Sequence, residues 1–253
     1  MNLRRCFAPL QLLFLLAAAL VTSGARPAMS QETITLANGQ VAQVKVVAVS
    51  PAGVKIRVGA ASIVEPFSNI TQVIMNPPPD FTAAGAAFES GDLQHALTLI
   101  TSVVDTYRGL PTDWAREAML MMGDIDLALN HLPEAQAAYT DYQSAYPTAS
   151  PDDVAVGLAG IDLANNDPAS AGQKIAPILD QALKQRAPSG AAAALYGRAF
   201  LISGKIREHT GDYSGALEDY LRAAVVFPED RIAAASAQTA ADALRKTHSV
   251  TIQ

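Results

Sequence analysis

Residues 197–228, GRAFLISGKIREHTGDYSGALEDYLRAAVVFP, decide how most of this chain folds. Apolar residues recur here at helical spacing, and the Gly-Asp-Tyr sequence at 211–213 interrupts them with a turn that can end one helix and begin the next. In the second half, Ala216, Tyr220 and Ala223 place small side chains around an aromatic ring on one helix face. The stretch therefore predicts two helices that pack closely as a pair.

The same arrangement recurs towards the N-terminus. In residues 115–147 a glycine, an alanine, a tyrosine and a proline keep the mutual offsets of their counterparts in 197–228. Two further units, around Gly91 and Asn166, keep the turn but have isoleucine in place of the aromatic residue. The alanines early in the four second helices are 39, 36 and 45 residues apart. The predicted helix N-caps are Asp92, Thr112, Ser150, Asp167 and Asp212, whose side-chain oxygens can accept from a free backbone amide.

This pattern resembles the tetratricopeptide (TPR) motif, in which small residues bring two helices together and an aromatic ring fills the groove between pairs. The resemblance implies a mostly α fold, an antiparallel helical-hairpin solenoid over residues 81–247 with about four hairpins and a capping helix. The spacings exceed the family's period of about 34 residues, so longer connections are expected, chiefly at 186–190. Pro177 should kink or interrupt its helix. The repeat-packing positions that the resemblance implies are Gly91, Ala96, Gly123, Ala135, Tyr139, Pro147, Ala171, Gly204, Gly211, Ala216, Tyr220, Ala223 and Pro228.

Residues 31–75 have a different pattern, in which short runs rich in Val, Ile and Thr alternate with turn residues. In 54–58 apolar residues alternate with Lys55 and Arg57, which predicts a strand with one buried face. Five short strands in a flat sheet would leave exposed edges, so we expect a small five-stranded β-barrel. It resembles SH3- and Sm-like barrels. The expected strands are 33–36, 40–50, 54–58, 62–66 and 71–75, and three prolines then predict a semi-rigid linker at 76–80.

The first 30 residues have the layout of a cleaved signal peptide. Arg4 and Arg5 precede an apolar run at 10–21, and small residues follow it, with cleavage expected after Ala25 or Ser30. The run is shorter than the roughly 20 residues that span a bilayer, so we expect no stable transmembrane anchor. The pattern predicts an exported protein, periplasmic or otherwise extracytoplasmic in a bacterium. Residues 248–253 are expected to form a flexible tail.

Charge and motif content argue against several classes of function. Without the three arginines of the leader, the chain has 15 basic and 24 acidic residues, a formal charge of −9, and no basic stripe that would favour nucleic acid. The four histidines, at 95, 131, 209 and 248, lack ligand spacing, so neither a metal nor a cofactor is expected. Asp124 and Asp126 are two residues apart on a helix and therefore face different sides, unlike an acid/base pair. The sequence predicts a protein that is not an enzyme.

The resemblance also implies where a partner binds. TPR-like proteins use the concave face lined by the first helix of each hairpin. Transferred to this chain, those positions predict an apolar groove with a basic end, where Arg198 and Lys205 lie seven residues apart and could receive a peptide carboxylate. Alternatively, several of these apolar residues pack against neighbouring helices. The predicted groove residues are Phe81, Phe88, Glu117, Leu120, Leu127, Val156, Leu163, Arg198, Leu201 and Lys205.

The function that follows is an exported interaction module that binds a protein or peptide. A structural or assembly factor of the cell envelope, with envelope proteins as partners, is the alternative. An enzyme whose site escapes motif analysis is a third possibility, and it would require a concave pocket with converging polar groups.

Overall fold

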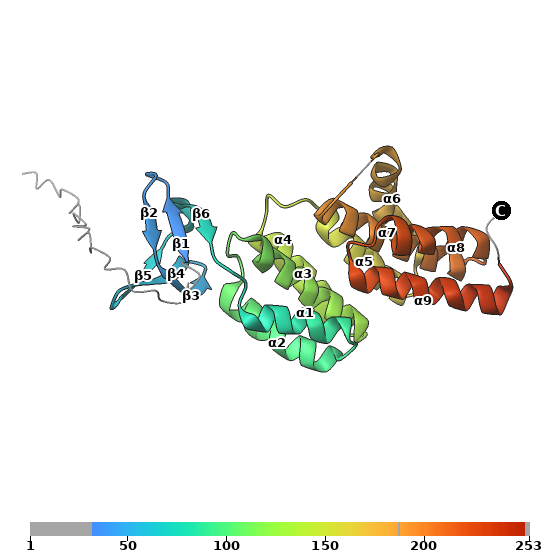
Figure 1. The fold of residues 1–253 in the computed structure, drawn as a ribbon, viewed down its shortest axis with the longest axis horizontal. Helices are drawn as coiled ribbons and strands as arrows, with labels where there is room; N and C mark the ends of the chain where they lie inside the picture. The colour runs from blue at the N-terminus through green and yellow to red at the C-terminus, as the bar shows by residue number, and fades with distance from the viewer. Residues whose placement is uncertain (1–31, 187, 251–253) are drawn as a thin grey trace, which may run out of the picture. The chain divides into compact units, whose positions relative to one another are not determined.

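The computed structural model describes residues 32–186 and 188–250, so the leader predicted at 1–30 and the end of the predicted tail lie outside the described residues. The described part is mostly helical, with a small region of strands ahead of the helices (Figure 1). The prediction of a mostly α fold with an N-terminal β region is therefore confirmed. Across the described residues, no helix combines the length and apolar character that a membrane span requires.

The strands form two antiparallel sheets of three strands each. One sheet has the order β2-β1-β6 and the other β3-β4-β5. In the described residues these pairings do not close into a barrel, which differs from the predicted arrangement. The strands are β1 (Thr33–Leu36), β2 (Val41–Gln43), β3 (Lys45–Ser50), β4 (Gly53–Val58), β5 (Ala61–Glu65) and β6 (Ile70–Ile74).

The difference arises at Val44, in the middle of the predicted strand 40–50. There the chain leaves one sheet and enters the other, and the Val44 amide donates to the carbonyl of Glu32 at 2.9 Å. The alternation in β4 is as predicted from Val54 to Arg57, since Val54 and Ile56 are buried while Lys55 and Arg57 are exposed, but Val58 at the end of the strand is 46% exposed. The period-two pattern therefore identified the buried face of most of β4. It did not indicate that the chain passes from one sheet to the other at Val44.

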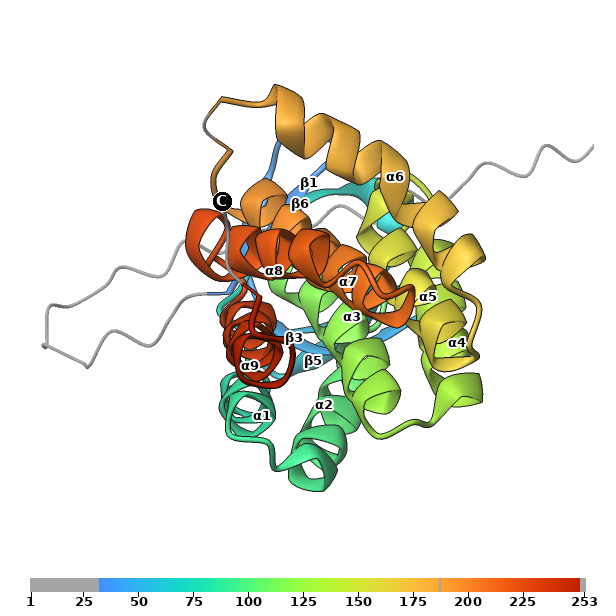
Figure 2. The same ribbon diagram turned by 90° about the vertical axis from the view of Figure 1, so that its right-hand side faces the viewer.

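The helices follow as consecutive pairs. Contacts join α1 to α2, α3 to α4, α5 to α6 and α7 to α8, and α9 packs on α8 and α7 (Figure 2). The helices are α1 (Pro79–Glu89), α2 (Leu93–Tyr107), α3 (Asp113–Ala128), α4 (Leu132–Ala145), α5 (Asp152–Ala164), α6 (Pro168–Lys184), α7 (Ala191–His209), α8 (Tyr213–Leu221) and α9 (Arg231–His248), with a π-helix, η2 (Arg222–Val226), after α8. Pro79 and Asp80 of the predicted linker thus belong to α1, and His248 of the predicted tail ends α9.

The turn inside each pair is built in the same way. One residue has a left-handed backbone, with φ between 61° and 83°, and the N-cap of the second helix follows it directly. Glycine and asparagine tolerate this conformation best among the common residues. Asp92, Asp167 and Asp212 then accept a hydrogen bond from the first helical turn. The left-handed residues are Gly91, Asn130, Asn166 and Gly211.

Glycines let tyrosine rings lie between helices. A Cβ on Gly123 of α3 would lie 2.6 Å from the Tyr139 ring, and one on Gly157 of α5 only 2.2 Å from it. Gly204 has the same relation to Tyr220, at 2.5 Å. Both rings are fully buried, as are the alanines at the implied repeat positions, Ala96, Ala135, Ala171, Ala216 and Ala223. Pro147 and Pro228 each lie two residues after the end of the second helical segment of their unit.

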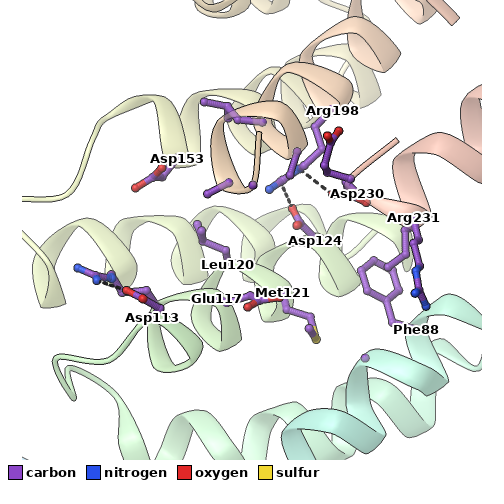
Figure 3. Close-up of a pocket in the computed structure, with 18 of the residues that line it drawn as sticks. Phe88, Asp113, Glu117, Leu120, Met121, Asp124, Asp153, Arg198, Asp230 and Arg231 are labelled. Atoms are coloured by element: carbon purple, nitrogen blue, oxygen red, sulfur yellow. Dashed lines mark hydrogen bonds and ion pairs between the residues drawn. The ribbon is translucent and has the colours of Figure 1, made fainter. Parts of the chain in front are cut away.

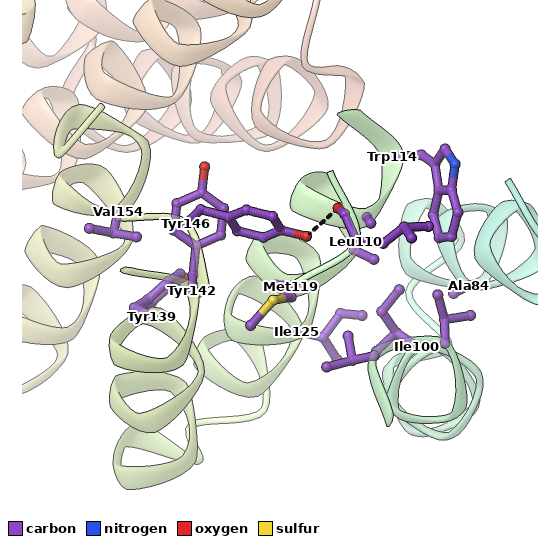
Figure 4. Packing of buried hydrophobic residues seen from close by; sticks show 14 of the residues in the cluster. Ala84, Ile100, Leu110, Trp114, Met119, Ile125, Tyr139, Tyr142, Tyr146 and Val154 are labelled. Atoms are coloured by element: carbon purple, nitrogen blue, oxygen red, sulfur yellow. Dashed lines mark hydrogen bonds between the residues drawn. The ribbon is translucent and has the colours of Figure 1, made fainter. Parts of the chain in front are cut away.

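One hydrophobic cluster joins the β region to the first five helices. Figure 4 shows part of this cluster among the helices. The Tyr146 hydroxyl donates to the carbonyl of Leu110 at 2.9 Å inside this cluster. Trp114 lies at its border with the strands, where the indole Nε1 donates to the carbonyl of Met75 at 3.1 Å. A second cluster fills the space among α5 to α9.

Two local predictions differ from the structure. α6 is not interrupted at Pro177 but continues through it, and the neighbouring Ile175 and Ile178 are buried, so burial of the helix face offsets the roughly 3 kcal/mol that an internal proline costs. α5 begins at Asp152 with Pro151 as its N-cap residue, whereas Ser150 was the predicted cap. The Ser150 hydroxyl still accepts from the Asp152 amide, at 3.2 Å.

Candidate functional site

The described residues line a solvent-open cavity of about 1000 Å³ (Figure 3). Helices α1, α3 and α7 supply most of its wall, and residues 229–232 at the start of α9 close it on one side. It is lined by Phe81, Thr82, Gly85, Phe88, Glu89, Asp113, Arg116, Glu117, Leu120, Met121, Asp124, Tyr142, Ala149, Ser150, Asp153, Gly190, Ala191, Ala194, Leu195, Arg198, Glu229, Asp230, Arg231 and Ile232.

Helical periodicity explains why these side chains converge. On α1, Phe81, Gly85 and Phe88 are four and then three residues apart, so they share one face. The lining residues of α3 run from Asp113 to Asp124, and those of α7 from Ala191 to Arg198, in the same steps of three and four. Each of these helices is the first member of its pair. The cavity wall is therefore made of three matching stripes, by which we mean the lining faces of α1 (residues 81–89), α3 (residues 113–124) and α7 (residues 191–198).

An ion-paired arginine spans the cavity between elements that are far apart in sequence. Arg198 Nη2 of α7 donates to Asp124 Oδ1 of α3 at 2.7 Å, and its Nε lies 3.9 Å from Asp230 Oδ2 ahead of α9 (Figure 3). The same Asp124 oxygen accepts from the Tyr139 hydroxyl of α4 at 2.6 Å. All three charged side chains are mostly shielded from solvent, with 18–24% of each exposed. Burial raises the pKa of Asp124, and the charge of Arg198 and the Tyr139 hydrogen bond oppose that shift.

The cavity is acidic. Seven carboxylates and three guanidinium groups line it, a formal charge of −4. Besides Arg198, Arg116 pairs with Asp113 and Arg231 lies 3.9 Å from Glu89. Asp153 accepts from the Tyr142 hydroxyl at 2.7 Å. Glu117 is exposed in part, yet partial desolvation by the surrounding wall raises its pKa, and the charge of Asp230 raises it further.

Half of the predicted groove residues meet in this cavity. Phe81, Phe88, Glu117, Leu120 and Arg198 line it. Of the two residues of the predicted basic end, Arg198 lines the cavity and is ion-paired with two carboxylates, whereas Lys205 is exposed outside the cavity.

The remaining apolar residues of the predicted groove pack against neighbouring helices, as the alternative interpretation stated. Val156 and Leu201 are buried in the second cluster, which Leu163 also contacts. Leu127 contacts Gly160 of α5 so closely that a Cβ on this glycine would lie 2.6 Å from Leu127 Cδ2. Among the first helices of the described pairs, α1, α3 and α7 each line the cavity with several residues, whereas α5 contributes Asp153 alone.

Several residues that line the cavity were not among those predicted from the sequence. Met121, Asp124 and Leu195 follow from the helical period of residues already predicted, so they could have been found. Residues 229–232 could not, because they line the cavity only through the return of α9 to α1, with Arg231 beside Glu89. No local pattern in the sequence encodes that contact.

Asp124 and Asp126 lie on opposite sides of α3, as their spacing predicts. Asp124 faces the cavity, whereas buried Asp126 lies 3.3 Å from His131 Nδ1 at the turn into α4. In the portion of the chain that the structure describes, no group of three or more His, Cys, Asp or Glu side chains is arranged to hold a metal ion.

Comparisons of the chain with models of known families, with curated proteins and with solved structures gave no match. The cavity and the repeat pattern are therefore the features that bear on function.

Proposed function

We propose that this protein is a non-catalytic interaction module whose TPR-like helical pairs bind a polypeptide segment of a partner in the cavity. The observation that carries the proposal is the convergence of matching stripes from α1, α3 and α7 on one space of about 1000 Å³. Each stripe belongs to the first helix of a pair. This is the face that the resemblance to the TPR motif implies for partner binding.

The size and lining of the cavity suit a segment of polypeptide. Ligand pockets of roughly 300–1000 Å³ hold molecules of drug size, so this volume is at the upper end. Phe81, Phe88, Leu120, Met121 and Leu195 provide partly buried apolar contacts that a peptide side chain can cover. Carboxylates at several positions supply acceptors for polar groups around it.

We also propose that the protein acts outside the cytoplasm, in the periplasm or an equivalent compartment. The support is the order of Arg4 and Arg5, an apolar run and small residues in the first 30 positions. The mature chain would then have no cysteine, because Cys6 lies in the leader, and this composition is compatible with an oxidising compartment.

The test is to fill the cavity without disturbing the fold. Gly85 of α1 lines the cavity, and a Cβ there would meet only Met121 Cε, at 3.8 Å. Gly85→Trp should therefore place an indole in the cavity, and replacing a helical glycine should not cost helix stability. Gly172→Trp is the matched control, because Gly172 is on α6, outside the cavity, with nothing within 4 Å of its Cβ position.

Random peptides displayed on phage are selected on the purified protein, and the dissociation constant of the best one is measured by calorimetry. Gly85→Trp should weaken binding more than about tenfold, a change of about 1.4 kcal/mol. Gly172→Trp should leave the dissociation constant unchanged. Equal binding by both variants, or the absence of any peptide sensitive to Gly85→Trp, would refute the proposal.

A further inference from the structure

The charges inside the cavity are not balanced. Each of its three guanidinium groups already lies near a carboxylate. Arg116 pairs with Asp113, Arg231 lies near Glu89, and Arg198 lies between Asp124 and Asp230. Four lining carboxylates therefore exceed the cations present. The cavity supplies acceptors for positive charge and holds no uncommitted guanidinium group.

Glu117 is the carboxylate best placed to receive a cation. In the described part of the chain it has no ion pair or side-chain hydrogen bond, and it lies on the cavity stripe of α3 one turn before Leu120 and Met121 (Figure 3). Its side chain is exposed and so accessible to a ligand, while partial desolvation and the charge of nearby Asp230 raise the pKa of its carboxyl. A positive group beside Glu117 would lower the free energy of the ionised carboxylate.

We propose that the segment bound in the cavity is cationic: a lysine or arginine pairs with Glu117, and a neighbouring apolar residue packs against Phe81, Leu120 and Met121. The inference rests on the proposed function and specifies the chemistry of its partner. An acidic segment is disfavoured, because it would have to displace Asp124 or Asp230 from Arg198 and meet an excess of negative charge.

The selection of phage-displayed peptides identifies the charge class directly. Peptides are selected on the wild-type protein, and those that also bind the Gly85→Trp variant are removed, so that the remaining peptides depend on the cavity. These should be enriched in lysine or arginine next to an apolar residue. Cavity-dependent peptides that are neutral or acidic would overturn this inference and leave the proposed function intact. Recovery of none would overturn both.

A double-mutant cycle then tests Glu117 itself. One synthetic cationic peptide and its counterpart with norleucine in place of lysine are titrated against wild type and Glu117→Gln. The substitution should weaken the lysine peptide about tenfold, and the norleucine peptide much less. Glu134→Gln is the control, since Glu134 is exposed like Glu117 but lies on α4 outside the cavity. Equal losses for both peptides, or for both glutamate variants, would overturn the assignment of Glu117.

Discussion

Single glycines determine how closely the helices approach one another. Tyr139 lies between α3 and α5 because Gly123 and Gly157 have no side chains there, and Gly204 leaves the same room for Tyr220. A protein interior is packed too tightly to accept an added methyl at such contacts without movement. These glycines are therefore structural, although each lies in a helix, where glycine is intrinsically unfavourable.

Gly157→Ala should destabilise the protein. The new Cβ would lie 2.2 Å from Tyr139 Cζ, and overpacking of this kind costs about 1–3 kcal/mol, more than the gain in helix propensity. Gly172→Ala, a helical glycine in open space, should instead stabilise by about 0.5–1 kcal/mol. Urea denaturation of both variants measures the two effects. The packing account is wrong if Gly157→Ala is as stable as Gly172→Ala.

The titration of Glu117 gives a prediction about pH. Its pKa is raised above the ordinary glutamate value in the free protein, and a cationic peptide favours the ionised form. Affinity for the lysine peptide should therefore increase as pH rises through the raised pKa, and decrease as pH falls below it. Calorimetry at a series of pH values should show this dependence for wild type and a flatter one for Glu117→Gln.

The comparison with Glu117→Gln is needed because other charged groups surround this carboxylate. They come from α1, α3, α5, α7 and the start of α9, and they are Glu89, Asp113, Arg116, Asp124, Asp153, Arg198, Glu229, Asp230 and Arg231. These groups contribute to the pH dependence of binding in both wild type and Glu117→Gln, so their contribution cancels when the two pH profiles are subtracted. A pH profile identical in wild type and Glu117→Gln would contradict the role given to Glu117.

At the scale of elements, capping and periodicity predicted most of the helices. Asp92, Thr112, Asp167 and Asp212 cap the helices for which they were predicted. The arrangement of the strands was harder to predict, because the alternation of apolar and polar residues does not specify which strands pair with each other. The change of sheet at Val44 has no local signal, since valine suits either sheet.

Trp114 connects the β region to the helices and gives a prediction at this scale. Trp114→Phe removes the hydrogen bond to Met75 and leaves that carbonyl without its donor, at a cost of about 1–3 kcal/mol. Hydrogen exchange should accelerate in the strands more than in α6 to α9. Tyr107→Phe is the control, because it keeps the ring that contacts Trp114 edge-on. If hydrogen exchange accelerated equally throughout the chain, Trp114 would not act as a local connection between the strands and the helices.

At the scale of the whole described chain, the return of α9 to α1 adds one more wall to the cavity that the helical pairs line. The Arg231–Glu89 pair is largely exposed and contributes little to stability. The position of α9 depends instead on its buried stripe, Ala233, Ala237, Ala241 and Leu244. The sequence predicted this helix as a cap, but its contribution to the cavity depends on contacts between the two ends of the array.

The central claim is that a partner segment occupies the cavity, and site-specific photocrosslinking in the native host tests it most directly. A photoreactive phenylalanine analogue replaces Leu120, which lines the cavity, or Leu183, which is 67% exposed on α6 outside it. The account predicts a discrete adduct from position 120 that excess cationic peptide abolishes, and no such adduct from position 183. Adducts that are equal at both positions, or that the peptide does not displace, would contradict it.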